Sequence, residues 1–398
     1  MGVQQPPSKG TEPWLINAVF VILVHIAAVV VPPFVHLKWQ TMLLTAVFYA
    51  IGTLGITLGY HRLWSHRSFE AVMPVRVIIA CMGTVAFQGS CLWWVKRHRL
   101  HHAFTDTEHD PYNAKAGLYF SHIGWIFKRP HYTRIKLIDV SDLKADAVVM
   151  LQHTYFPLLA LFFAFVLPTY IARAWGDALG GFVYAGVVKA VMVWHATFCI
   201  NSLAHWVGEQ EYSLDTTARG GLLLAVLTQG EGHHNYHHAF PKDYRNGVRW
   251  FDYDPTKWAV TALATLGLAS NLHTTPKSEI EKGKIQVLEH KTSERRKNEF
   301  WGLADSDLVV YESLDQVKKE CSEGRQLLVI DNLVVDVAGW KDQHPGGSKH
   351  ITNNIGRNAT SSFYGLLNNH TSSAKTLVRT MAVGKIVYTN VDVTAKEE

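Results

Sequence analysis

Histidine is concentrated in one part of this sequence, in clusters whose spacing suits metal binding. The chain has 22 histidines, and 15 of them fall between His61 and His238. Two of the clusters share the pattern HxxHH, whose three histidines would lie on one face of a helix. Each such triplet could therefore direct its imidazoles at one metal centre. The three clusters are HRLWSH (His61 and His66), HRLHH (His98, His101 and His102) and HNYHH (His234, His237 and His238).

A fourth element, NSLAH, places Asn201 four residues before His205. The four elements together contain nine histidines, with Asn201 as a further ligand, either directly or through water. Nine imidazoles are too many for one ion and suit two. Neutral imidazole binds iron, zinc, copper and nickel, so the type of ligand leaves the metal open.

Four long apolar runs are the elements that must position these histidines. The chain is 48% hydrophobic and 18% charged, against about 25% charged in an ordinary soluble domain. Each run approaches the roughly 20 residues that a membrane-spanning helix needs, and short loops join them into two hairpins. A fifth run, residues 73–95, is interrupted by Arg76 near its start and by Gln88-Gly89-Ser90 near its end. The uninterrupted apolar part has only about ten residues and is too short to cross. The four runs are residues 14–31, 42–59, 155–171 and 182–203.

Basic residues predict the orientation of these hairpins. Residues 60–150 carry twelve lysines and arginines, whereas the two short loops carry only Lys38 and Arg173. Because basic loops stay on the cytosolic side, the long segment and every histidine cluster are expected there, with both termini. Lys189 lies within the fourth run, where it either marks a functional site or extends its amine toward the membrane surface.

The C-terminal part has the composition of a separate soluble domain. Residues 277–299 are charged at 12 of 23 positions, which is typical of a solvated linker or an exposed helix. Apolar runs that begin at Leu327 and Leu333 then predict short strands. We expect three parts: residues 1–275, a linker over 276–305, and a small domain over 306–390.

The motifs HRLWSH, HRLHH, NSLAH and HNYHH together resemble those of the membrane acyl-CoA Δ9 desaturases, the stearoyl-CoA desaturase family. The resemblance covers about residues 14–260. It implies two iron ions on the nine histidines, with Asn201 bound more weakly through water. It also implies a narrow, bent, apolar tunnel for the acyl chain, lined at the bend by Gln88, Trp94, Trp194 and Thr197.

The sequence DVAGWKDQHPGG, from Asp336 to Gly347, resembles the cytochrome b5 family. In that family the HPGG turn supplies one axial haem ligand, here His344, and the second is expected to be His370, with His350 as the rival. Glycines allow close approach to a flat macrocycle, and two axial histidines leave no position for oxygen. The resemblance therefore implies haem b as an electron carrier.

The two resemblances together predict an oxygen-dependent acyl-CoA Δ9 desaturase in the endoplasmic reticulum membrane. The expected fold is an all-α four-helix transmembrane domain with a cytosolic His-rich helical cap, followed by a small α+β cytochrome b5-like domain. Expected partners are a long-chain saturated acyl-CoA, O2, NADH-cytochrome b5 reductase and membrane lipid, with no nucleic acid. Lys96, Lys128 and Arg129 would contact the coenzyme A phosphates or only anchor the protein at the membrane.

Two other functions remain open from the sequence. A histidine-rich membrane hydroxylase would share the metal site but return oxygen to the substrate. A membrane protein that binds metal or haem without catalysis would retain the metal but consume no oxygen. Front-end desaturases are disfavoured. Their typical pattern is an N-terminal cytochrome b5 domain and a last motif that begins with glutamine, whereas this chain has a C-terminal haem motif and His234 at that position.

Overall fold

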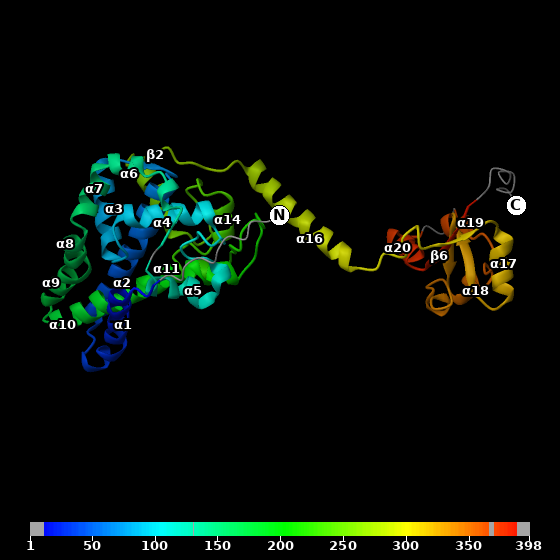
Figure 1. Cartoon of the computed structure of the whole chain (residues 1–398), viewed down its shortest axis with the longest axis horizontal. Coiled ribbons are helices and arrows are strands. Elements are labelled where there is room, and N and C mark those ends of the chain that lie inside the picture. Colours follow the sequence, from blue (N-terminus) through cyan, green and yellow to red (C-terminus); the bar gives the residue numbers. More distant parts are fainter. Residues whose placement is uncertain (1–11, 130, 366–369, 388–398) are drawn as a thin grey trace. The chain divides into compact units, whose positions relative to one another are not determined.

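A computed structural model describes residues 12–129, 131–365 and 370–387 of the chain. The chain divides into two compact units, residues 1–290 and 291–398. The first unit is helical, and the second contains a small mixed sheet with short helices (Figure 1).

Four helices of the first unit are long and apolar enough to cross a membrane, among the described residues. They confirm the four predicted runs, and the protein is a multi-pass membrane protein. The first is α1 (Leu15–Val30), continued to Phe34. The second joins α2 (Trp39–Leu54) to a π-helical segment, Gly55–Ser65. The third spans Phe156–Arg173 and includes α8 (Phe156–Leu161) and α9 (Leu167–Arg173), and the fourth spans Ala178–Trp206 and includes α10 (Ala178–Gly180), α11 (Lys189–Asn201) and α12 (Leu203–Trp206).

Small residues let the second span approach helix α3 (Met73–Val85) closely. A Cβ atom on Gly55 would lie 2.2 Å from the backbone nitrogen of Gly83, and one on Gly83 would lie 2.5 Å from the ring of Tyr60. Helices in membranes commonly pack through such small residues, because backbone contact there gains van der Waals energy. This packing fixes the π-helical segment that carries His61. With 13 residues, α3 is too short to cross, as predicted.

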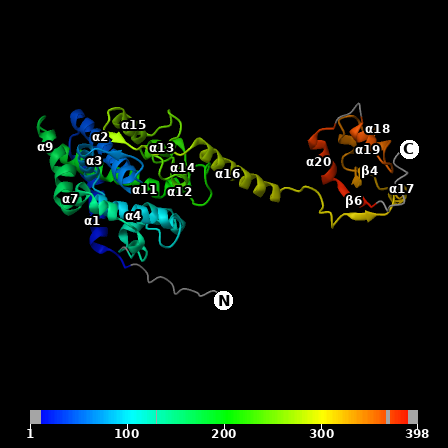
Figure 2. The ribbon, with the colours of Figure 1, turned by 90° about the horizontal axis from the view of Figure 1, so that it is seen from above.

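Short helices form the cap beside the ends of these spans. In Figure 2, α12, α13 and α14 gather on the side of the unit from which α16 departs. Strands β1 (Glu70–Ala71) and β2 (Ala269–Ser270) pair antiparallel at the edge of the cap. The remaining helices of the unit are α4 (Cys91–Phe104), α5 (Leu118–His122), α6 (Ser141–Ala145), α7 (Ala147–Thr154), α13 (Leu222–Leu227), α14 (His234–Ala239), α15 (Pro255–Thr265) and α16 (Lys277–Asn298).

The second unit is a four-stranded sheet in the order β3-β6-β5-β4. Strand β3 pairs parallel with β6, and the other pairs are antiparallel. Alternate residues of β4 point to opposite faces, so Leu328 enters one apolar cluster and Leu327 the other. The predicted strands at Leu327 and Leu333 are confirmed. The elements are β3 (Val309–Tyr311), α17 (Leu314–Ser322), β4 (Leu327–Ile330), β5 (Leu333–Asp336), α18 (Ser348–Thr352), α19 (Thr360–Tyr364), α20 (Ser372–Thr380) and β6 (Ala382–Ile386).

The structure contradicts one of the two interpretations of Lys189, the one in which its amine extends toward the membrane surface. Its side chain does not extend toward the membrane surface, because the residue has no exposed area at all. The amine instead donates hydrogen bonds to the carbonyls of Val85 at 2.8 Å and Ala164 at 3.5 Å. These two carbonyls replace the water that an extended lysine would reach.

The contact between Gly55 and Gly83 gives a prediction about stability. Replacing Gly55 by alanine should lower the thermal unfolding midpoint of the purified protein by about 5 °C, since overpacking costs on the order of 1–3 kcal/mol. Gly221→Ala is the matched control, because Gly221 has open space around its Cβ position. Equal midpoints for the two variants, measured by thermal unfolding in detergent, would contradict this packing.

Candidate metal centre

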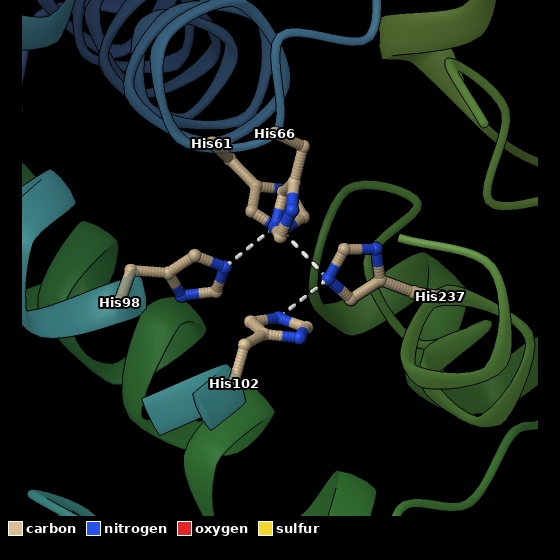
Figure 3. A group of neighbouring side chains, drawn as sticks. All are labelled: His61, His66, His98, His102 and His237. Atoms are coloured by element: carbon tan, nitrogen blue, oxygen red, sulfur yellow. Dashed lines mark hydrogen bonds between the residues drawn. The ribbon is translucent and has the colours of Figure 1, made fainter. Parts of the chain in front are cut away.

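The structure brings all nine histidines of the sequence motifs into two adjacent groups. Within each group, one ligand nitrogen of every residue lies within 4.8 Å of the others. In Figure 3 the imidazoles of the first group converge from separate segments of the chain on a common centre. The first group is His61, His66, His98, His102 and His237, and the second is His101, His205, His234 and His238.

Each HxxHH triplet is divided between the two groups, so the expectation that one triplet converges on one centre is wrong. In α4, His98 and His102 belong to the first group and His101 to the second. In α14, His234 and His238 belong to the second group and His237 to the first. A helix turns by about 100° per residue, so positions i and i+4 differ by about 40° whereas i+3 and i+4 diverge by about 100°.

Nitrogens on the outer side of three imidazoles contact carboxylates or a hydroxyl. His101 Nδ1 forms a hydrogen bond with Asp110 at 2.8 Å, whereas His61 Nδ1 lies 2.9 Å from Glu231 without hydrogen-bond geometry. His205 Nδ1 contacts Thr217 Oγ1 at 2.8 Å, and this hydroxyl donates to Asp106. A proton held on Nδ1 leaves the Nε2 lone pair free to face inward, which is the arrangement of metal-binding histidines.

The inner nitrogens are too crowded to be explained by hydrogen bonds alone. Nε2 of His237 lies 3.0 Å from Nε2 of both His61 and His102. A neutral imidazole nitrogen can donate or accept along one direction only, so these contacts cannot all be satisfied by protons. A shared cation satisfies them, and the residues present therefore fit a metal ion in each group.

Burial keeps six of the nine imidazoles neutral. It holds the pKa values of His98 and His237 well below the ordinary histidine value, and neighbouring imidazoles lower them further. His66, His102, His234 and His238 behave in the same way. Metal binding to these residues at neutral pH therefore does not compete with a bound proton.

A buried ionic network holds Glu231 in place. Arg62 donates to Glu231 at 3.0 Å and, through two nitrogens, to both carboxylate oxygens of Asp254 at 2.8 and 3.0 Å. Burial alone would raise the pKa of Glu231, but His61 and Arg62 beside it lower that pKa to about 2. The carboxylate is therefore ionised at neutral pH and adds negative charge next to the first group.

A cavity of about 270 Å³ extends from this centre between α1, α4 and the fourth span. Its wall includes Trp94, whose ring stacks on His98 with centroids 4.9 Å apart. Gln88 donates to Thr197 Oγ1 at 2.7 Å, which joins two segments of the wall. Five residues predicted to contact substrate line the cavity: Gln88, Trp94, Lys128, Trp194 and Thr197.

Of three further predicted site residues, Asn201 lines the cavity, whereas Lys96 and Arg129 do not. Asn201 lines both the large cavity and a smaller one of about 30 Å³ that reaches His98 and His101. Lys96 and Arg129 are not among the described residues that line either cavity. The Arg129 guanidinium lies 3.6 Å from the Glu12 carboxylate. The assignment of Lys96 and Arg129 to the coenzyme A phosphates stays a prediction.

The second unit contains another pair of facing histidines. The His344 and His370 rings lie 6.2 Å apart between centroids, and Phe363 stacks on His370 at 4.2 Å. His344 Nδ1 donates to the Gly347 carbonyl and His370 Nδ1 to the Phe363 carbonyl, at 3.2 and 2.8 Å. Both Nε2 atoms are thereby left as acceptors, which fits haem iron held between two imidazoles.

The residues that contact the histidines from outside were not predicted from the sequence. Asp106 and Asp110 follow HRLHH, and Glu231 precedes HNYHH by three positions. Acidic residues beside a histidine motif were a signal for such contacts, because metal-binding imidazoles commonly bond a carboxylate through their second nitrogen. Thr217 had no local signal, since it meets His205 only through the fold.

The contact with Glu231 gives a prediction about metal affinity. Glu231→Gln removes the charge that faces His61 and should weaken metal retention about 10- to 100-fold, as is typical for such partners. Competition with a chelator, followed by metal analysis of the protein, measures this change. Glu108→Gln, which alters an exposed carboxylate of the same cap, is the control and should retain wild-type affinity.

Comparisons with known proteins agree with both sites. Residues 37–270 match the family model described as fatty acid desaturase, and residues 313–387 match the one described as cytochrome b5-like heme/steroid binding domain. A probable acyl-CoA desaturase of Schizosaccharomyces pombe is 43% identical over 88% of this chain and 72% of that protein. Acyl-CoA desaturase 1 of Saccharomyces cerevisiae is 38% identical over 88% and 69%.

The similarity extends to animal proteins over a smaller share of this chain. The Delta(9)-fatty-acid desaturase fat-7 of Caenorhabditis elegans is 38% identical over 73% of this chain and 87% of that protein. The nine gathered histidines, the cavity that reaches them and the paired histidines of the second unit agree with these matches. This chain belongs to the fatty acid desaturase family, as an acyl-CoA desaturase with a fused C-terminal cytochrome b5-like domain.

Proposed function

We propose that this acyl-CoA desaturase binds two iron ions, one in each histidine group, and introduces a cis double bond at the Δ9 position of long-chain saturated acyl-CoA. The observation that carries the proposal is the convergence of nine imidazoles at the end of an apolar cavity. When bound, the irons supply the activated oxygen that an unactivated methylene pair requires. Asn201 would act as a weaker ligand through water, for which the small cavity has room.

The electron balance explains why a haem domain belongs on the same chain. Reduction of O2 to two waters takes four electrons and four protons. The two C–H bonds of the substrate supply two of each. The remaining two electrons must arrive one at a time, which suits a haem with both axial positions filled, and two protons come from solvent. A tethered donor raises the local concentration to about the millimolar range.

The cavity residues would hold the acyl chain in register. Apolar rings of Trp94 and Trp194 suit an alkyl chain, and the hydrogen bond from Gln88 to Thr197 joins two segments of the wall and so fixes its shape. Lys128 lines the same cavity and would contact a phosphate of the coenzyme A group. Lys96 and Arg129 are proposed for the same contact on the basis of their sequence positions alone.

His344 and His370 would hold haem b, and the haem would accept electrons from NADH-cytochrome b5 reductase. We propose desaturase, linker and haem segments over residues 1–275, 276–305 and 306–390, of which residues 1–11, 130, 366–369 and 388–390 lie outside the described part. The proposed location is the endoplasmic reticulum membrane, with both termini cytosolic. The basic residues between the second and third spans support this orientation.

The reaction can be tested directly with the full chain. Purified protein loaded with iron and haem, supplied with stearoyl-CoA, NADH, cytochrome b5 reductase and O2, should form a cis-9 monounsaturated product that is lighter by two hydrogens. Mass spectrometry of the released acyl chain measures this difference. A product heavier by one oxygen would indicate a hydroxylase, and oxygen consumption independent of substrate would contradict both functions.

The electron route gives a separate prediction. His344→Ala should abolish the haem absorbance band and reduce turnover driven by NADH and reductase to background, because one axial ligand is lost. The variant should keep wild-type iron content, since His344 belongs to the other unit. His350→Ala, which alters an exposed histidine of helix α18, is the matched control. Undiminished turnover of His344→Ala without free cytochrome b5 would contradict the route.

A further inference from the structure

Residues 85–89, which are the last residue of helix α3 and the four that follow it, close one side of the larger cavity. Phe87, Gln88 and Gly89 line the cavity, and Val85 and Ala86 are buried behind them. Irregular backbone in apolar surroundings needs a partner for each carbonyl, because no water is present to supply one. The helix itself provides acceptors for the N–H groups of Ala86 and Phe87, but not donors for the carbonyls of Val85 and Phe87.

Phe87 adopts a backbone conformation that is unusual for a bulky residue. Its φ is 55°, in the left-handed region, which persists only where the surroundings hold it. Trp194 Nε1 donates to the Phe87 carbonyl at 3.0 Å. The Phe87 ring lies between those of Trp194 and Phe165, with centroid distances of 6.3 and 5.1 Å. The third and fourth spans therefore hold this strained residue between them.

Lys189 connects the same elements from behind the cavity wall. Its amine donates to the Val85 carbonyl, at the start of the segment, and to the Ala164 carbonyl of the third span. The amine also lies 6.0 Å from the centre of the Phe165 ring. Among the described residues no carboxylate forms an ion pair with Lys189. Its polar contacts are thus spent on holding backbone that supports the cavity wall.

We propose that Lys189 is a positioning residue that fixes where along the acyl chain the double bond forms. By holding residues 85–89, it fixes the wall that decides which methylene pair lies beside the histidine groups. Neighbouring methylenes of an alkyl chain are chemically alike, so position alone selects among them, and a displacement on the order of 1 Å is enough to change reactivity strongly. This inference rests on the proposed function.

The test compares the positions of the double bond in the products of variants. Lys189→Met keeps an unbranched side chain of similar length but removes the donor, so the wall should lose its fixed position. The fraction of product with the double bond away from the main position should rise about fivefold or more. Lys189→Arg keeps donors at the end of a long side chain and should restore the wild-type fraction.

A matched control comes from the same span. Tyr184 Oη donates to the carbonyls of Pro32 and Val35, at 2.9 and 2.6 Å, and does not line the cavity. Tyr184→Phe removes a side-chain donor to backbone carbonyls from a partly buried position of the same span and should leave the isomer fraction unchanged. Isomer fractions are ratios, so they can be measured by mass spectrometry even when only a small part of the variant protein folds.

The outcomes separate this inference from the proposed function. Absence of unsaturated product from the wild-type chain would refute the proposed function itself. A wild-type chain that forms the expected product, beside a Lys189→Met variant with an unchanged isomer fraction, would overturn the positioning role. Loss of all product in both the Met and the Arg variants would also overturn it, since Lys189 would then serve folding alone.

Discussion

The first unit depends on gathering nine imidazoles that point inward at close range. Protonated imidazoles at these distances would repel one another in surroundings with little water to screen the charge. For six of them, burial opposes protonation by lowering the pKa. Asp110 and the Thr217 hydroxyl hold the outer nitrogens of His101 and His205, so the inner nitrogens of these two residues present lone pairs to a cation. Folding and metal binding are therefore coupled in this unit.

The membrane spans give this centre its position and its access route. The second span approaches α3 through Gly55 and Gly83, which places the π-helical segment bearing His61 over the cap. π-helical turns often occur at functional sites, where they redirect side chains from a regular helix. Ile56 and His61 of this segment line the smaller cavity, and the larger cavity reaches His98 of α4, so the elements that hold the imidazoles also shape the space beside them.

The second unit uses the same side chain for a different purpose. His344 and His370 face each other from two loops, and backbone carbonyls fix which nitrogen carries the proton. Two imidazoles on one haem fill both axial positions and favour electron transfer, whereas the first unit gathers many imidazoles and a cavity for substrate. The chain thus joins an electron carrier to a site proposed for oxygen chemistry, which is consistent with the electrons that desaturation requires.

Local patterns in the sequence determined the four spans, the short length of α3, the strands at Leu327 and Leu333, and the nine histidines of the motifs. These features depend on hydrophobic periodicity and residue spacing, which act over a few turns of chain. Only the tertiary structure decided which segments share each histidine group, because the histidines of one group come from distant parts of the chain. The same holds for Thr217 beside His205 and for Lys189 behind the cavity wall. Their partners lie 12 and 104 residues away, and packing alone brings them together.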